Sequence, residues 1–264
     1  MQTAFASQKK TNLYIILCSI FLCNAIVAEI IGAKIFSLET LLGTAPAQLN
    51  LGLDFKLDFN LTAGVIIWPL VFVTSDVINE YFRKEGVKRI SFITAALIAY
   101  IFVVILAVTK LPPADFWMQL NAKGPNGEPF DINYAFNSIF LQGLGIMLGS
   151  ITAFLVGQLL DAYTFHWIRS MTGSKKIWLR ATGSTLVSQL VDSFVVLVVA
   201  FYLFGNWSFK QVIAVGIINY IYKFGIAIAT TPLLYVMHFV IDRYLGTNKA
   251  ESMAEKSAQE SQFE

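Results

Sequence analysis

Charged residues, histidine and cysteine are all scarce in this chain. Only 14% of its 264 residues are Asp, Glu, Lys or Arg, and it has two histidines and two cysteines. Cys18 and Cys23 are five residues apart in one apolar run, so they share no helical face and match no metal-binding spacing. The chain contains no His-Glu-x-x-His, Gly-x-Ser-x-Gly or nucleotide-binding motif. These absences argue against an enzyme, and we expect neither a metal nor a cofactor.

Long apolar runs make up most of the sequence. Hydrophobic residues account for 56% of it and the mean hydropathy is +0.63, which is too apolar for one soluble core of this size. A helix needs about 20 apolar residues to cross the hydrocarbon layer of a bilayer. The sequence therefore predicts an all-α membrane protein with six transmembrane helices, near residues 12–37, 62–82, 90–110, 137–165, 179–204 and 211–242.

The basic residues outside these spans are unevenly distributed. Thirteen of them lie at one side of the predicted membrane, and the other side has four, Lys56, Lys110, Lys123 and Lys210. Because short cytoplasmic loops retain Lys and Arg, both termini are predicted to be cytoplasmic. Membrane topology accounts for these basic residues. Because they form no continuous basic stripe, we expect no nucleic-acid partner.

The regions outside the spans have distinct patterns. Residues 49–61 alternate between apolar and polar side chains, which predicts a short extracytoplasmic β-hairpin between the first two helices, although an extended amphipathic loop also fits. The tail turns polar and loses periodicity. We therefore expect a single six-helix membrane domain over residues 1–245 and a disordered cytoplasmic tail over residues 246–264.

Six charged side chains interrupt the apolar spans. A charge near the bilayer centre costs at least about 2.5 to 3.5 kcal/mol, so such residues usually face a cavity or a partner. Helical spacing places some of them on faces shared with small or polar residues, as for Glu29 near Ala25 and Gly32. Carboxylates, carboxamides and aromatics together suit a planar heterocycle with hydrogen-bond donors at its edge, and a proton or cation path is the other interpretation. The six residues are Glu29, Lys34, Asp76, Glu80, Asp192 and Lys223.

A purely structural interpretation applies to some of these residues. Buried acid–base pairs can hold helices together, and Asp76, Glu80 and Asp161 near the cytoplasmic end can simply solvate the interface. Lys34 is expected to extend toward the outer surface.

Four long segments resemble the queuosine precursor transporter family, a group of integral membrane proteins akin to vitamin uptake transporters. They are AGVIIWPLVFVTSDVINEYF from Ala63, GSITAFLVGQLLDAYTFHWIR from Gly149, WLRATGSTLVSQLVDSFVVL from Trp178 and INYIYKFGIAIATTPLLYVMHFVIDRYLG from Ile218. Motifs of this length are far more specific than short patterns. The resemblance covers most of the chain apart from its first ten residues, the outer loops and the tail.

This resemblance implies an importer in the bacterial inner membrane. Its substrates would be 7-cyano-7-deazaguanine and 7-aminomethyl-7-deazaguanine, which are precursors of queuosine, a modified tRNA base. On that basis we expect the base to be bound by Glu29, Gln189, Asp192, Asn219, Lys223 and Asn24. We expect a gate or coupling cluster at Asp76, Asn79, Glu80, Gln158 and Asp161.

Other interpretations stay open at this stage. The chain could be the substrate-binding subunit for another vitamin or purine-like compound, which would need a partner ATPase, or a proton- or ion-conducting membrane protein. The expected partners are the 7-deazaguanine base and the lipid bilayer, and the sequence is compatible with a homodimer.

Overall fold

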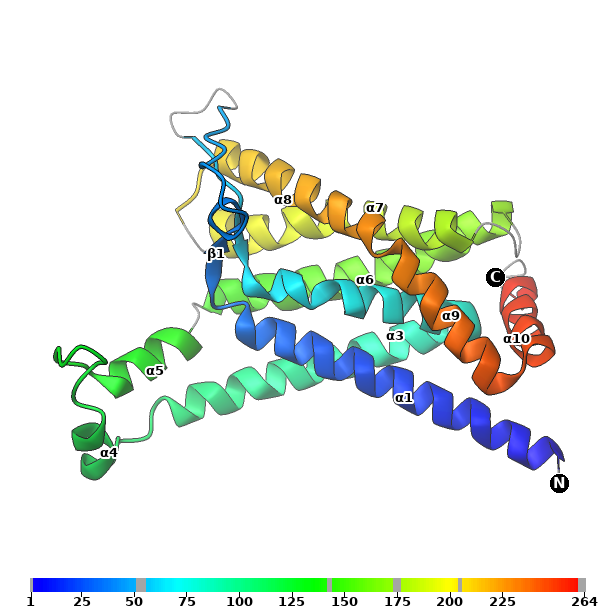
Figure 1. The fold of residues 1–264 in the computed structure, drawn as a ribbon, viewed down its shortest axis with the longest axis horizontal. Coiled ribbons are helices and arrows are strands. Elements are labelled where there is room, and N and C mark those ends of the chain that lie inside the picture. The colour runs from blue at the N-terminus through cyan, green and yellow to red at the C-terminus, as the bar shows by residue number, and fades with distance from the viewer. Residues whose placement is uncertain (1, 51–55, 142–143, 173–176, 204–205, 261–264) are drawn as a thin grey trace.

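The structure, a computed structural model, describes residues 2–50, 56–141, 144–172, 177–203 and 206–260 and is largely helical. Figure 1 shows long helices that run roughly side by side, with both termini at one end and β1, α4 and α5 at the other. The helices are α1 (Gln2–Ile31), α2 (Leu38–Leu41), α3 (Trp68–Val108), α4 (Asp115–Leu120), α5 (Ile132–Phe140), α6 (Leu144–Thr172), α7 (Ile177–Leu197), α8 (Phe209–Ala229), α9 (Thr231–Leu245) and α10 (Thr247–Glu260). A 3₁₀ turn, η1 (Ala63–Ile66), precedes α3, and a π-helical segment, η2 (Val198–Leu203), extends α7.

Helix α3 covers two of the predicted spans. A straight helix of its 41 residues would be about 60 Å long, twice the thickness of the hydrocarbon layer. Arg83 inside it has φ 67° and ψ 177°, which no helix adopts. In Figure 1 the two arms on either side of this residue run in opposite directions. The predicted spans 62–82 and 90–110 are therefore the arms of one helical hairpin.

Four helical segments are long and apolar enough to cross a membrane, among the residues that the structure describes. They are Gln8–Ile31, Trp68–Val108, Trp178–Leu203 and Phe209–Leu245. The sequence predicts six because it counts the arms of α3 separately and includes α6. Helix α6, 29 residues long, is not among these four. The chain is an all-α membrane protein.

The C-terminal end of the first predicted span is not helical, although the sequence predicts a helix to residue 37. Helix α1 ends at Ile31, and β1 (Ile35–Ser37) pairs antiparallel with β2 (Asn60–Thr62), with Ile35 opposite Thr62. Leu49 and Leu57 form one isolated antiparallel bridge. The hairpin predicted over residues 49–61 is not confirmed, since β2 pairs with β1 outside this segment and residues 51–55 lie outside the described residues.

The tail also differs from the sequence-based expectation of disorder. Residues Thr247–Glu260 form α10, which packs against α3, α6 and α9. Ala250, Met253 and Ser257 are buried at helical spacing. These three residues form a narrow face on a helix that is otherwise polar and charged. The average polarity of the segment therefore does not indicate that one face is buried. Residues 261–264 lie outside the described residues.

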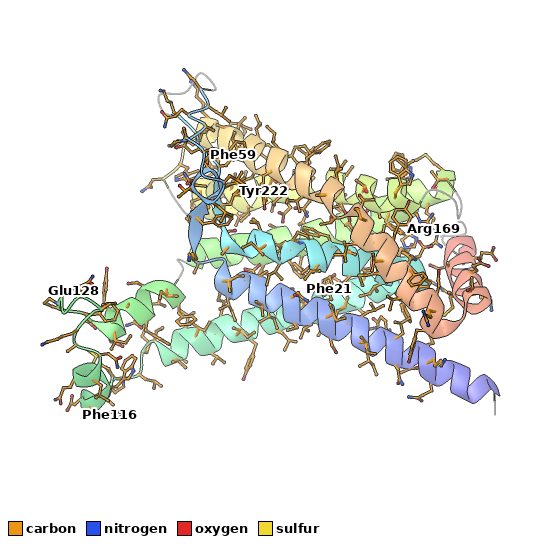
Figure 2. All side chains as sticks on the ribbon, in the orientation of Figure 1. Phe21, Phe59, Phe116, Glu128, Arg169 and Tyr222 are labelled. Atoms are coloured by element: carbon orange, nitrogen blue, oxygen red, sulfur yellow. The ribbon has the colours of Figure 1, made fainter. Side chains whose placement is uncertain are left out.

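The main hydrophobic core joins α1, both arms of α3, α6, α7, α9 and α10. Phe21, Val77, Ile78 and Phe165 are fully buried in it. Large apolar side chains such as Ile15, Phe92 and Val103 are instead exposed. Figure 2 shows many side chains projecting from the outer flanks of the helices. Apolar residues both inside and outside a bundle are what a lipid environment requires.

Candidate functional site

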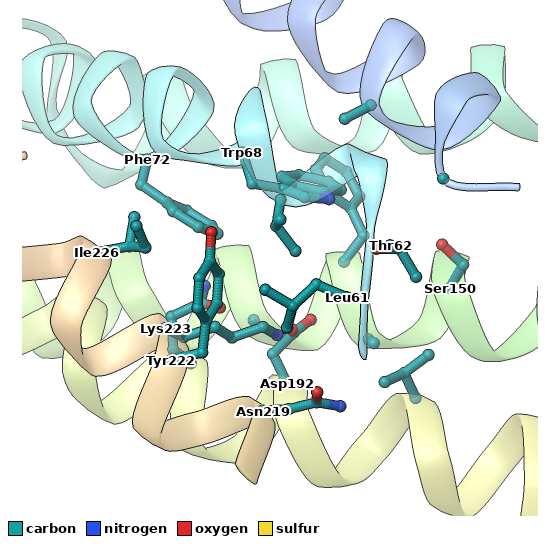
Figure 3. A pocket seen from close by; sticks show the side chains of 18 of the residues that line it. Leu61, Thr62, Trp68, Phe72, Ser150, Asp192, Asn219, Tyr222, Lys223 and Ile226 are labelled. Atoms are coloured by element: carbon teal, nitrogen blue, oxygen red, sulfur yellow. The ribbon is translucent and has the colours of Figure 1, made fainter. Parts of the chain in front are cut away.

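A cavity of about 320 Å³ lies between α1, α3, α6, α7 and α8 (Figure 3). This volume falls within the range of small-molecule sites. Leu61 of β2 lines it and points inward, so the short sheet covers part of the cavity. Its aromatic lining comes from separate elements and consists of Trp68, Phe72, Phe154, Phe201, Trp207 and Tyr222.

Two of these rings form a platform at the start of α3. Trp68 and Phe72 are one helical turn apart, and their ring planes are inclined by only 18° with centroids 5.8 Å apart. Tyr222 projects into the cavity from α8 (Figure 3). Flat rings on separate helices offer faces on which a planar ligand can stack.

Three charged side chains line the cavity, within the part of the chain that the structure describes: Glu29 of α1, Asp192 of α7 and Lys223 of α8. The Lys223 ammonium forms an ion pair with Asp192 Oδ2, and the side chains of both residues are about one-fifth exposed. Ser150 Oγ of α6 donates a hydrogen bond of 2.5 Å to Glu29 Oε2. The two carboxylates therefore have different partners, one a cation and the other a neutral hydroxyl.

Four carboxamides line the cavity: Asn60, Gln158, Gln189 and Asn219. Gln158 Oε1 accepts a hydrogen bond of 3.0 Å from Ser75 Oγ of α3. Gln189 Oε1 is buried without a hydrogen-bond partner among the described residues. Asn219 of α8 is labelled among the lining residues in Figure 3. Amides of this kind can both donate to and accept from the edge of a ligand.

The structure brings together five of the six residues that the sequence assigns to substrate binding. Those lining the cavity are Glu29, Gln189, Asp192, Asn219 and Lys223. Asn24 does not line it, because its Nδ2 donates to the carbonyl oxygen of Ile20 one turn earlier in α1. Gln158, assigned by sequence to the gate, lines the cavity instead.

Sequence reasoning missed several lining residues. The four-residue spacing of Trp68 and Phe72, just before the polar cluster of the second span, was an available signal. Tyr222 directly precedes Lys223 in the sequence, which was a second available signal. Ser150 has no comparable signal, since its role depends on a residue 121 positions away.

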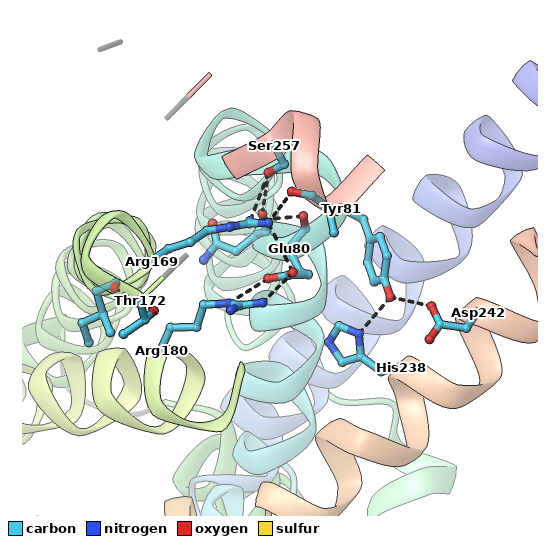
Figure 4. Close-up of polar contacts among 11 residues, drawn as sticks. Glu80, Tyr81, Arg169, Thr172, Arg180, His238, Asp242 and Ser257 are labelled. Atoms are coloured by element: carbon cyan, nitrogen blue, oxygen red, sulfur yellow. Dashed lines mark hydrogen bonds and ion pairs between the residues drawn. The ribbon is translucent and has the colours of Figure 1, made fainter. Parts of the chain in front are cut away.

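A second polar site lies nearer the termini, where Glu80 of α3 meets two arginines (Figure 4). Arg180 donates from Nε to Glu80 Oε2 at 3.0 Å and from Nη2 to Oε1 at 2.7 Å. Arg169 Nη2 lies 3.2 Å from Oε1. We call these three residues the Glu80 cluster. Both arginines are 1% exposed, so the carboxylate compensates charges that have almost no access to solvent.

Helices α9 and α10 attach to the same end of the molecule. Arg169 also donates to the carbonyl oxygen of Ala254 and, at 3.3 Å, to Ser257 Oγ. Tyr81 Oη donates to Asp242 Oδ1 at 3.1 Å and lies 2.8 Å from His238 Nδ1 (Figure 4). These contacts connect both C-terminal helices to α3 and its Glu80 cluster.

The remaining predicted gate residues lie between the two sites. Asp76, Asn79 and Asp161 are all buried and do not line the cavity. Asp161 Oδ1 accepts a hydrogen bond of 3.2 Å from Ser188 Oγ. Asp76 Oδ1 and both polar side-chain atoms of Asn79 lack a hydrogen-bond partner among the described residues. The predicted gate cluster is therefore divided among the cavity wall, this buried interface and the Glu80 cluster.

A helical membrane protein with a ligand-sized polar cavity between its helices has the architecture of a small-molecule transporter. Residues 62–237 match the family described as "Putative vitamin uptake transporter", and the chain belongs to this family. The matched region contains Asp192 and Lys223 but not Glu29.

Curated relatives carry a more specific name. The chain is 29% identical over 181 residues to a "Probable queuosine precursor transporter" of Bacillus subtilis, a match that covers 67% of this chain and 72% of the relative. A "Queuosine precursor transporter" of Escherichia coli is 27% identical over 149 residues, 55% of this chain and 58% of the relative. No solved structure shows a significant match to the chain.

Proposed function

We propose that this protein imports queuosine precursors across the bacterial inner membrane for tRNA modification. Its substrates would be the 7-deazaguanine bases that carry a cyano or an aminomethyl group at position 7. The names of the curated relatives support this proposal. The chemistry of the cavity supports it independently.

The observation that carries the proposal is the Asp192–Lys223 ion pair in an aromatic cavity. A guanine edge presents two donors, the 2-amino group and N1–H, beside one acceptor, O6. A carboxylate next to an ammonium presents the complementary pattern, with acceptors beside a donor. Trp68, Phe72 and Tyr222 provide faces for the bicyclic ring.

The other cavity residues have supporting roles in this proposal. Gln189 and Asn219 complete the hydrogen bonds to the base, since amide groups can satisfy either polarity at its edge. Glu29 is a further acceptor on the opposite helix, α1. The cavity lies on the β-sheet side of the Glu80 cluster, so Asp76, Asn79, Glu80 and Asp161 would form the inner gate, and Gln158 would connect the gate to the cavity.

The proposed topology has six crossings and both termini in the cytoplasm. It counts α1, each arm of α3, α6, α7 with η2, and α8 with α9 as one crossing each, within one domain over residues 1–245. The location of both termini at the same end of the molecule is consistent with this even number. Alternating access around the cavity would move the base from one side to the other.

Uptake of labelled precursors tests the proposal in cells that cannot synthesise them. Wild-type protein is expected to restore precursor-dependent queuosine in tRNA. Asp192→Asn should lower uptake about tenfold or more, since it removes a charge-assisted hydrogen bond. Asn24→Ala, at a site away from the cavity, is the matched control. Wild-type protein that supports no queuosine formation would refute the substrate, and normal uptake by Asp192→Asn would refute the site.

A second candidate function follows from the family description. Vitamin uptake by a substrate-binding subunit would require a partner ATPase, because the chain has no nucleotide-binding motif. Purification from native membranes distinguishes the two. An associated ATPase, with uptake that depends on it, would favour this second candidate.

A further inference from the structure

The charged residues of the cavity do not balance one another. Its lining contains two carboxylates, Glu29 and Asp192, and one ammonium, Lys223, among the residues that the structure describes. With all three ionised, the cavity has a net charge of −1. A low-dielectric site with one uncompensated carboxylate binds a cation more strongly than a neutral molecule of the same shape.

The uncompensated group is Glu29. Lys223 pairs with Asp192, on the side of the cavity formed by α7 and α8. Glu29 receives only the neutral hydroxyl of Ser150, on Oε2, and no other described side chain donates a hydrogen bond to it. The Ser150 contact also restricts the orientation of the carboxylate. Glu29 is therefore a pre-oriented carboxyl group with an oxygen available to a ligand.

The two bases of the proposed function differ in charge at one position. A primary alkylamine has a pKa of about 10, as for lysine, so the aminomethyl group is an ammonium at neutral pH. The cyano group is uncharged and has no hydrogen to donate. In both bases the substituent lies on the five-membered ring, whereas the amino group and N1–H lie on the six-membered ring. A base whose guanine edge meets Asp192 and Lys223 can thus present its substituent to a different wall of the cavity.

We propose that Glu29 binds the ammonium of the aminomethyl precursor and makes the protein selective for cationic over neutral 7-deazaguanines. This inference rests on the proposed function and assigns its preferred substrate. An ammonium that contacts the other oxygen of Glu29 adds an ion pair beside the Ser150 hydrogen bond and neutralises the cavity. A neutral substituent leaves the charge of Glu29 uncompensated.

The decisive experiment compares three bases of similar shape in wild-type protein and in Glu29→Gln. The bases are 7-aminomethyl-, 7-hydroxymethyl- and 7-cyano-7-deazaguanine, of which the second is a neutral analogue close in size to the first. Affinity is measured with purified full-length protein in lipid nanodiscs, and uptake is measured in cells lacking precursor synthesis. Asn24→Ala, on the same helix but away from the cavity, is the matched control.

Wild type and Asn24→Ala are expected to bind the aminomethyl base about tenfold or more tightly than the hydroxymethyl base, the ratio typical of a hydrogen bond between charged groups. In Glu29→Gln this ratio should fall to near one, mainly through weaker binding of the aminomethyl base. Equal affinities in wild type would overturn the inference even without the variant. So would an unchanged ratio in Glu29→Gln. If wild type binds none of the three bases, the proposed function fails together with this inference. If it binds them with equal affinity, only the inference fails.

Discussion

Glu80 shows at the scale of single residues how this protein accommodates charge inside apolar helices. Its two oxygens accept from Arg180 and Arg169, residues 100 and 89 positions away in the sequence. The bidentate geometry with Arg180 satisfies both oxygens of the carboxylate. Asp192 has one ammonium partner and Glu29 only a hydroxyl. A carboxylate whose two oxygens both have charged partners, such as Glu80, is typical of a structural contact. A carboxylate with fewer partners, such as Glu29, can still bind a ligand.

Glu80→Gln should therefore reduce stability severely. The substitution leaves two buried guanidinium groups without a compensating anion, and breaking a buried pair costs about 3 to 5 kcal/mol. Thermal unfolding of the purified protein in detergent measures the loss. Glu85→Gln, on the same helix but exposed, should change the unfolding midpoint little. A Glu80→Gln protein as stable as wild type would show that the arginines find other partners.

Glu39 provides a pH-dependent contact outside the membrane-spanning segments. Hydrogen bonds from the Phe59 N–H at 2.6 Å, from Ser37 Oγ and from the Ala47 N–H hold the pKa of its carboxyl below its usual range, with Phe59 contributing most. A lowered pKa in the folded state means that this stabilisation is present above the unfolded pKa of about 4.3 and is lost as the pH falls through the folded pKa.

Hydrogen exchange at the Phe59 amide tests this prediction. Protection, corrected for the intrinsic exchange rate, should be constant near neutral pH and decline in acid. Glu39→Gln should lower protection at neutral pH and remove the acid dependence. The same acid dependence in the variant would assign it to another group.

At the scale of elements, the turn of the α3 hairpin depends on one unfavourable backbone conformation. Arg83 has φ 67° and ψ 177°, a region that is essentially restricted to glycine and costs about 1 to 3 kcal/mol for other residues. Arg83→Gly should relieve this strain, partly offset by about 0.5 to 1 kcal/mol of added chain entropy in the unfolded state. We expect a higher unfolding midpoint.

Gly86→Ala, three residues later, is the contrasting variant. Its added Cβ would lie 3.0 Å from Phe82 Cβ and 3.3 Å from Ile78 Cγ2, so crowding should lower the midpoint. The same thermal unfolding assay measures both proteins. A destabilised Arg83→Gly would mean that the arginine side chain contributes more to the turn than its backbone strain costs.

For the whole molecule, the distribution of basic residues predicts the orientation in the membrane. Starting from a chain with Cys18→Ala and Cys23→Ala, single cysteines at the exposed positions Leu120 of α4 and Ser252 of α10 report opposite sides. A membrane-impermeant maleimide should label Leu120→Cys in intact spheroplasts and Ser252→Cys only after permeabilisation. The reverse pattern would invert the topology, and labelling of both in intact spheroplasts would contradict the three crossings proposed between these two positions.

Much of the candidate site could be predicted from local sequence because the cost of an intramembrane charge is a local property. Glu29, Asp192 and Lys223 were distinguished by residue type and depth alone, and all three line the cavity. Asn24 does not line the cavity, because the polarity of a residue does not reveal which way its helical face is turned. The disordered tail was wrong because its buried stripe of Ala250, Met253 and Ser257 needs a partner surface to become apparent.

The sequence by itself determined the helical membrane architecture, since an apolar run of bilayer length has to satisfy its backbone hydrogen bonds internally wherever it lies. Only the tertiary structure decided which charges meet. Glu80 pairs with Arg169 and Arg180, Asp192 pairs with Lys223, and Glu29 has Ser150 alone. Such pairings join residues 31 to 121 positions apart. They depend on how helices pack against one another, and this packing makes one buried carboxylate structural and leaves another available to a ligand.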